Sequence, residues 1–121
     1  MKSALVLFAH GSRDPQWAAP FLEVQKRVAS SKPDGMVELA FLEMMQPTLA
    51  EAVDKVIAKG GKRITVAPLF MAQGAHVKRD LAKLIADMRA QHQGIEIVLL
   101  PPAGEVTAVT EAISNWLCAS S

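Results

Sequence analysis

The chain has 121 residues, which is enough for one hydrophobic core, and we expect a single domain over residues 1–121. Half of the residues are hydrophobic and 21% are charged, the ordinary balance of a globular protein. A formal net charge of +1 argues against a nucleic-acid-binding protein, because neutralising phosphates requires a clustered excess of cations.

The first predicted element is a strand at residues 5–8, a short apolar run typical of a buried parallel strand. Polar residues from His10 onward interrupt this run too early for a signal peptide or a membrane span. We therefore expect a cytoplasmic protein with no membrane partner. The segment after His10 predicts an irregular turn capped by Asp14 and passing through Trp17, followed by a helix over about residues 18–30.

Three further strands alternate with three further helices. The strands are expected at residues 36–42, 64–69 and 95–100. The second helix should begin near Pro47 and end at Gly60, and the third should open at His76 and stop at Gly94. The last helix is expected to be buried through an apolar stripe of Val106, Val109, Ile113, Trp116 and Leu117.

This alternation predicts an α/β fold, a three-layer doubly wound sandwich whose parallel sheet is flanked by helices. With right-handed crossovers on opposite faces, the four strands take the order 2-1-3-4. Open sheets of this kind bind ligands at the carboxyl ends of their strands. The expected crevice opens between the loop carrying His10 and the loop carrying His76.

Three metal-binding side chains, His10, Glu43 and His76, each follow a different predicted strand at its carboxyl end. Two imidazoles and a carboxylate suit cobalt, nickel, iron or zinc better than magnesium or calcium, which prefer oxygen ligands alone. Each of the three taken alone is more typical of a helix cap or of a hydrogen-bonded or charged residue at a strand end. Their shared position favours a common metal site.

Two cations, Lys78 and Arg79, occupy the first turn of the predicted third helix, where the helix dipole disfavours positive charge. An anionic ligand shared with Arg13 and the hydroxyl of Ser12 would explain them, while local pairing with Asp80 or simple solvation is the alternative. Met45 and Met71 provide apolar surface near the same rim for a substrate, although packing in a core or dimer interface is the usual role of clustered methionines.

Residues 8–15 (FAHGSRDP), 40–43 (AFLE) and 68–80 (PLFMAQGAHVKRD) together resemble the small CbiX-type chelatases, relatives of sirohydrochlorin ferrochelatase. This family inserts Co²⁺, and in related members Fe²⁺ or Ni²⁺, into the anionic tetrapyrrole sirohydrochlorin without ATP. The resemblance implies that His10 and His76 bind metal and accept protons as catalytic residues, with Glu43 as their acidic partner. It also implies a homodimer that builds the substrate cleft, a divalent metal as substrate and no organic cofactor.

Other functions fit parts of the same pattern. A protein that only carries metal or tetrapyrrole would use the same residues without turnover, and a pure interaction module would need neither histidine. A histidine phosphatase also has His-Gly after its first strand, but that chemistry requires arginine directly before the histidine, and this chain has Ala9.

Overall fold

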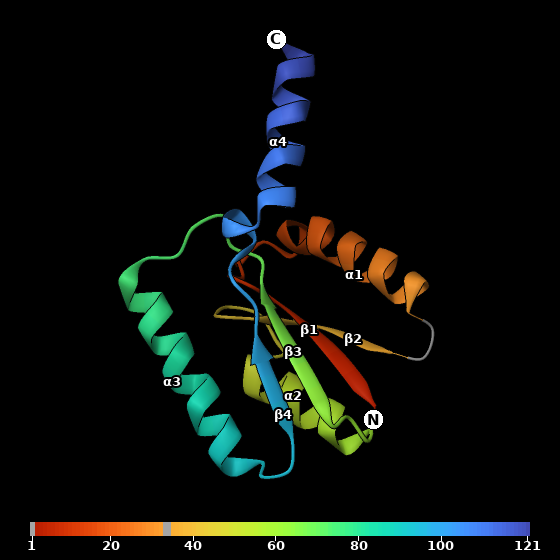
Figure 1. Cartoon of the computed structure of the whole chain (residues 1–121), viewed down its shortest axis with the longest axis vertical. Helices are drawn as coiled ribbons and strands as arrows, with labels where there is room; N and C mark the ends of the chain where they lie inside the picture. Colours follow the sequence, from red (N-terminus) through yellow and green to blue (C-terminus); the bar gives the residue numbers. More distant parts are fainter. Residues whose placement is uncertain (1, 33–34) are drawn as a thin grey trace.

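The computed structural model describes residues 2–32 and 35–121, and in these ranges four parallel strands form one sheet in the order β2-β1-β3-β4 (Figure 1). The strands are β1 (Ser3–Ala9), β2 (Met36–Phe41), β3 (Arg63–Pro68) and β4 (Glu96–Leu99). In the central register, Val6 of β1 lies between Glu38 of β2 and Val66 of β3. The predicted fold class and strand order are confirmed.

The helices follow the strands in the expected alternation: α1 (Ala19–Ser31), α2 (Leu49–Ala58), α3 (Ala75–Gln91) and α4 (Thr107–Ser120). Two 3₁₀ turns, η1 (Pro15–Ala18) and η2 (Ala103–Glu105), precede α1 and α4. Helix α2 begins two residues after Pro47, because Thr48 and Glu51 form a reciprocal capping box that fixes its start. The helix was expected to begin near Pro47, and the capping box places its first residue at Leu49.

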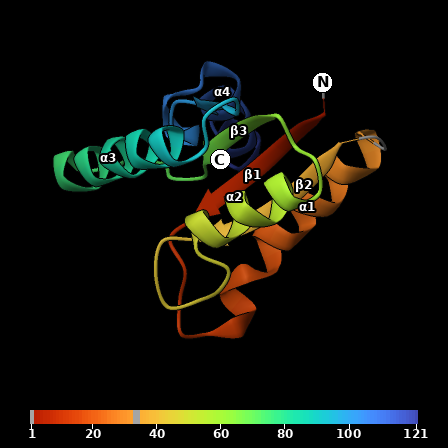
Figure 2. The ribbon, with the colours of Figure 1, turned by 90° about the horizontal axis from the view of Figure 1, so that it is seen from below.

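The main hydrophobic core lies between the sheet and the two helices α2 and α3. Val6 and Phe8 of β1 are buried there with Val56 of α2 and Ile85 of α3, each 2% exposed or less. Alternate residues of the same strand, such as Leu7, point to the opposite face and pack against the segment around α1. Figure 2 shows α3 and α1 on opposite sides of the strands. The sheet is thus covered from both faces, but unequally.

Helix α4 is the main departure from expectation. None of its residues is buried, and Trp116 and Leu117 are 66% and 53% exposed. Figure 1 shows α4 projecting from the carboxyl edge of the sheet, away from α1, α2 and α3. The prediction of a buried last helix was wrong, because the connection from β4 directs α4 away from the sheet. The apolar stripe itself is present on the helix.

Among the described residues, no helix has both the length and the apolar character needed to cross a lipid bilayer.

Candidate functional site

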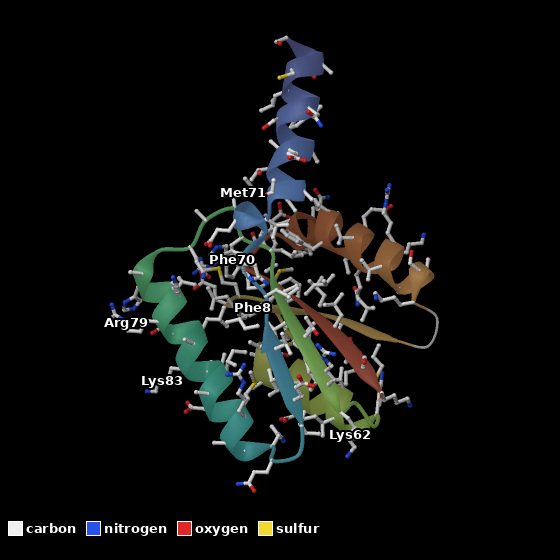
Figure 3. All side chains as sticks on the ribbon, viewed as in Figure 1. Phe8, Lys62, Phe70, Met71, Arg79 and Lys83 are labelled. Atoms are coloured by element: carbon white, nitrogen blue, oxygen red, sulfur yellow. The ribbon has the colours of Figure 1, made fainter. Side chains whose placement is uncertain are left out.

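His10 follows β1 directly and lies exposed at the carboxyl edge of the sheet. Its imidazole ring stacks on Phe70, with the ring centroids 4.2 Å apart and an interplanar angle of 34°. Phe70 in turn packs against Phe8, with centroids 5.7 Å apart, and both phenylalanines are almost completely buried. Figure 3 shows these two side chains at the upper end of the strands. The imidazole therefore rests on a buried aromatic support, while His10 as a whole stays exposed.

The loop after β2 is joined to the loop after β1 by backbone hydrogen bonds. The N–H of Leu42 donates to the carbonyl of Ala9 at 2.9 Å, and the N–H of Glu43 donates to the carbonyl of His10 at 3.0 Å. Gly11 adopts a φ of +95°, and a Cβ at this position would overlap the carbonyl oxygen of Glu43. Glycine is required here, and it allows Glu43 to lie beside His10.

The segment that follows Gly11 is shaped by its own polar side chains. The hydroxyl of Ser12 accepts a hydrogen bond from the N–H of Asp14 at 3.1 Å, and the carboxylate of Asp14 accepts one from the N–H of Gln16 at 2.9 Å. The predicted cap at Asp14 is confirmed. Arg13 lies exposed between these two residues. Its guanidinium is presented on a loop whose backbone is already fixed.

His76 lies in the first turn of α3, apart from the other two predicted ligands. Its side chain is 85% exposed, and its Nε2 atom is 3.6 Å from the Asp80 carboxylate. Within residues 2–32 and 35–121, no three histidine, cysteine or acidic side chains lie close enough together to hold a metal ion. The structure thus brings His10 and Glu43 together by their backbones but does not bring His76 to them.

Lys78 lines a hollow of about 310 Å³ at the carboxyl end of β4, together with Gln73 and Glu105. The side-chain oxygen of Gln73 is buried and has no hydrogen-bond partner among the described residues. Arg79, by contrast, points outward from α3 (Figure 3). The two cations predicted to share one anion therefore face different surroundings.

The predicted methionines also differ. Met45 packs partly buried against the core on the α1 face, whereas Met71 is 60% exposed at the carboxyl edge. A second hollow, of about 590 Å³, is lined by Glu43, Met44 and Met45 with their neighbours Gln46 and Thr48. A hollow with both apolar and polar walls thus lies beside Glu43, on the loop that is bonded to the His10 loop.

Two residues of this edge were missed by reasoning from the sequence. Phe70 was given no role of its own, but it supports the imidazole of His10. Gln73 was not considered, although it is the one amide in an otherwise apolar stretch, residues 70–75. A polar residue inside an apolar loop was the signal that could have pointed to it.

The fold and this edge define a doubly wound α/β unit in which His10 and Glu43, at the carboxyl ends of the first two strands, are joined by a backbone hydrogen bond. The model of the CbiX family matches residues 4–119, and the chain belongs to this family. A sirohydrochlorin cobaltochelatase of Saccharolobus islandicus is 36% identical over 106 residues, which cover 83% of this chain and 81% of the relative.

Similar solved structures come from the same family. A CbiX protein of Marinobacter aquaeolei, described as a putative cobalamin biosynthesis protein, superposes with a TM-score of 0.84 at 29% identity over 98% of this chain and 96% of that one. The sirohydrochlorin chelatase SirB of Bacillus subtilis subspecies spizizenii, solved in complex with cobalt, gives a TM-score of 0.78 at 30% identity. The match covers 98% of this chain but 51% of SirB, so SirB is about twice as long.

Proposed function

We propose that this chain is a metal chelatase that inserts a divalent metal into sirohydrochlorin without ATP, and that its preferred metal is Co²⁺. The observation that carries the proposal is the pairing of His10 with Glu43 at the carboxyl edge, in a chain of the CbiX family. Relatives named sirohydrochlorin cobaltochelatase that match most of this chain support the choice of substrate and metal.

The reaction exchanges protons for a metal ion. Two pyrrole N–H bonds break, their nitrogens bind the incoming M²⁺, and the other two ring nitrogens coordinate through their lone pairs. Two protons leave to bases, and no electron is transferred. A protein that accelerates this exchange must hold the metal on weak, exchangeable ligands and place a base next to the ring.

His10 fits both requirements. The contact with Phe70 restricts the orientation of its ring, so the exposed imidazole is held in place at the carboxyl edge. Glu43 lies on the loop bonded to the His10 backbone, where a carboxylate attracts a bound cation. We assign metal binding to His10, Glu43 and His76, with either histidine as proton acceptor.

The substrate's acidic groups require cations at the same edge. Lys78, at its hollow by β4, and Arg13, on its fixed loop, are best placed to pair with peripheral carboxylates. Arg79 and Ser12 stay in the proposed substrate set, and Met45 and Met71 are assigned contact with the apolar face of the ring. The chemistry needs no organic cofactor, and we place the reaction in the cytoplasm.

A flat macrocycle needs walls on both faces, and one copy of this chain offers a single edge. SirB, with about twice the length of this chain, has room for two such units in one polypeptide. We propose that two copies of this chain assemble as a homodimer and provide the two walls. In this arrangement, the exposed His76 of α3 joins the site from its own or the second copy.

The alternative is a carrier that holds metal or tetrapyrrole without catalysing insertion. The two functions are separated by turnover. Full-length protein, substoichiometric to Co²⁺ and sirohydrochlorin, should form many metallated rings per chain, followed by the change in absorbance of the macrocycle. At most one product per chain would identify a carrier and overturn the proposal.

Histidine variants test the site in the same assay. We expect His10→Ala to lower the rate at least about 100-fold, the usual range for loss of a general base. The matched control is His92→Ala, because His92 lies at the end of α3 opposite to His76. There its Nε2 atom is 3.1 Å from Oδ1 of Asp54. A double His10→Ala, His76→Ala variant should be little worse than either single variant if both serve one metal. Near-normal turnover in His10→Ala would contradict the assigned site.

A further inference from the structure

The residue that follows Glu43 has a strained backbone. Met44 has a φ of +66°, and among the described residues it is the one residue other than glycine with a positive φ. The N–H of Met45 donates to the carbonyl of Glu43 at 2.8 Å, which closes a three-residue turn around Met44. A turn with this hydrogen bond and a positive φ at its centre is a γ-turn of the rare, strained type. Glycine would adopt this conformation without strain.

The backbone around this turn is fixed on both sides. The N–H of Glu43 donates to the carbonyl of His10, and the N–H of Phe41 donates to the carbonyl of Pro47 at 2.9 Å, which closes the base of the loop. Figure 2 shows this loop, between β2 and α2, extending beyond the end of the sheet. A strained conformation persists only where the surrounding structure fixes it, and such positions cluster at functional sites. The loop therefore holds the strained turn at the edge that carries His10.

The side chain of Met44 does not explain the strain through packing in the free chain. It is 58% exposed, and it forms part of the wall of the hollow beside Glu43. Because more than half of the side chain contacts solvent, its burial stabilises the fold only weakly. Methionine at this position thus strains the backbone without a matching gain from the core. This combination indicates a contact that forms when another molecule is bound.

We propose that Met44 is a substrate contact, whose thioether packs against the face of the tetrapyrrole and strengthens its binding. The inference rests on the proposed function and adds a contact residue to it. In the proposed reaction, Glu43 helps to bring the metal to the nitrogens at the centre of the ring. Consecutive Cα atoms lie about 3.8 Å apart, and a tetrapyrrole is several times wider than that. A ring centred near the Glu43 carboxylate therefore extends across Met44.

The chemistry of the side chain fits a flat, conjugated ring. A thioether is polarisable and packs favourably against aromatic rings, and its rotatable bonds let it adapt to a ring that bends. Two other apolar residues of this edge, Leu42 after β2 and Met71 after β3, are 38% and 60% exposed. Apolar side chains beside the cations of the same edge suit a ring with apolar faces and an acidic periphery. A second copy of the chain is the other candidate to cover Met44, and the experiment below distinguishes the two.

Two substitutions separate the side chain from the backbone strain. Met44→Gly and Met44→Ala both remove the thioether, but only glycine also relieves the strain. We expect Met44→Gly to unfold at a temperature roughly 2–5 °C above that of Met44→Ala. Both variants should bind metal-free sirohydrochlorin about 5- to 10-fold more weakly than the wild-type chain, measured by the change in absorbance of the ring. Equal unfolding temperatures would remove the strain on which the inference rests.

Two further variants are controls for the contact. Met44→Leu keeps an apolar side chain of similar volume and should retain most of the affinity for sirohydrochlorin. Val24→Ala shortens an exposed apolar side chain on α1, where Val24 is 41% exposed, and should leave the affinity unchanged. If Val24→Ala weakened binding as much as Met44→Ala, the effect would not belong to a contact at Met44, and the inference would be wrong.

Co²⁺ binding without the tetrapyrrole separates a ring contact from an effect on Glu43. Measured by calorimetry, the Co²⁺ affinity of Met44→Ala should equal that of the wild-type chain, because the variant keeps the Glu43 carboxylate and its backbone bonds. A parallel loss of Co²⁺ and sirohydrochlorin affinity would show that Met44 acts by positioning Glu43, and would overturn the inference.

The remaining outcomes separate this inference from the proposed function. Wild-type turnover together with normal sirohydrochlorin affinity in both Met44→Gly and Met44→Ala would overturn the inference alone. A changed dimer dissociation constant with normal sirohydrochlorin affinity would also overturn it, because Met44 would then contact a second copy. A wild-type chain that neither binds nor metallates sirohydrochlorin would refute the proposed function, and the substrate contact with it.

Discussion

The main-chain N–H of Glu43 donates a hydrogen bond of 3.0 Å to the carbonyl oxygen of His10. This bond continues the pairing of β1 with β2 beyond the last residues of the strands, Ala9 and Phe41. The backbones of His10 and Glu43 are therefore held side by side by an extension of the sheet, and this approach depends on Gly11.

Replacing Gly11 with alanine should damage both stability and metal binding. The new Cβ would overlap the carbonyl of Glu43, and the φ of +95° is unfavourable for any other residue. We expect a loss of about 2 kcal/mol or more in the free energy of unfolding, measured by urea denaturation, together with weaker Co²⁺ binding.

Gly94→Ala is the matched control, since Gly94 has a similar φ of +88° but open space around its Cβ position. Its cost should be roughly 1 kcal/mol. Equal costs for the two variants would show that the approach of Glu43 is not what requires Gly11.

Replacing Phe70 with leucine should impair catalysis more than stability. Phe70 supports the ring of His10 on one side and packs against Phe8 on the other. A hydrophobic exchange of similar volume costs about 1 kcal/mol in unfolding free energy, but leucine removes the flat support of the imidazole.

Phe8→Leu is the comparison for this prediction, because Phe8 is equally buried, packs against Phe70 and lies one layer below His10. We expect similar stability of the two variants but a lower metallation rate for Phe70→Leu. Equal rates would mean that stacking on Phe70 does not orient His10.

The strand order was predictable because each strand is a short apolar run and right-handed crossovers leave few arrangements. The closeness of His10 and Glu43 followed from that order, since neighbouring parallel strands end together. The exposed position of α4 was not predictable, because its apolar stripe indicates burial without saying against what. The support of His10 by Phe70 also depends on side-chain packing that strand periodicity does not encode. The placement of His76 was not predictable either. Its position after β3 in the sequence does not determine where the first turn of α3 places its side chain.

The start of α2 provides a prediction about stability alone. Thr48 accepts a hydrogen bond from the N–H of Glu51, whose carboxylate accepts one from the N–H of Thr48. Thr48→Ala should lower the free energy of unfolding by about 1 kcal/mol, measured by thermal or urea denaturation. Thr48→Ser keeps the acceptor oxygen and should retain most of the stability. If the serine variant loses as much as the alanine variant, the hydroxyl is not what stabilises this helix.

The last prediction separates the cations of α3. Lys78 lines the hollow at the carboxyl end of β4, while Arg79 and Lys83 point outward from the helix (Figure 3). If Lys78 pairs with a carboxylate of sirohydrochlorin, Lys78→Gln should weaken binding of the macrocycle several-fold, in the range of about 3- to 10-fold for one partly exposed ion pair. The effect should be larger at low salt, because the screening length is about 30 Å at 0.01 M and about 3 Å at 1 M ionic strength. Titration of the chain with sirohydrochlorin, followed by quenching of tryptophan fluorescence, measures the affinity.

Lys83→Gln is the control for loss of one positive charge from the same helix, and it should change the affinity little at any ionic strength. Arg79→Gln tests the remaining predicted contact, since a loss as large as that of Lys78→Gln would mean that substrate reaches the outer side of α3. Equal affinities for Lys78→Gln and Lys83→Gln at low salt would show that Lys78 acts only through the net charge of the protein.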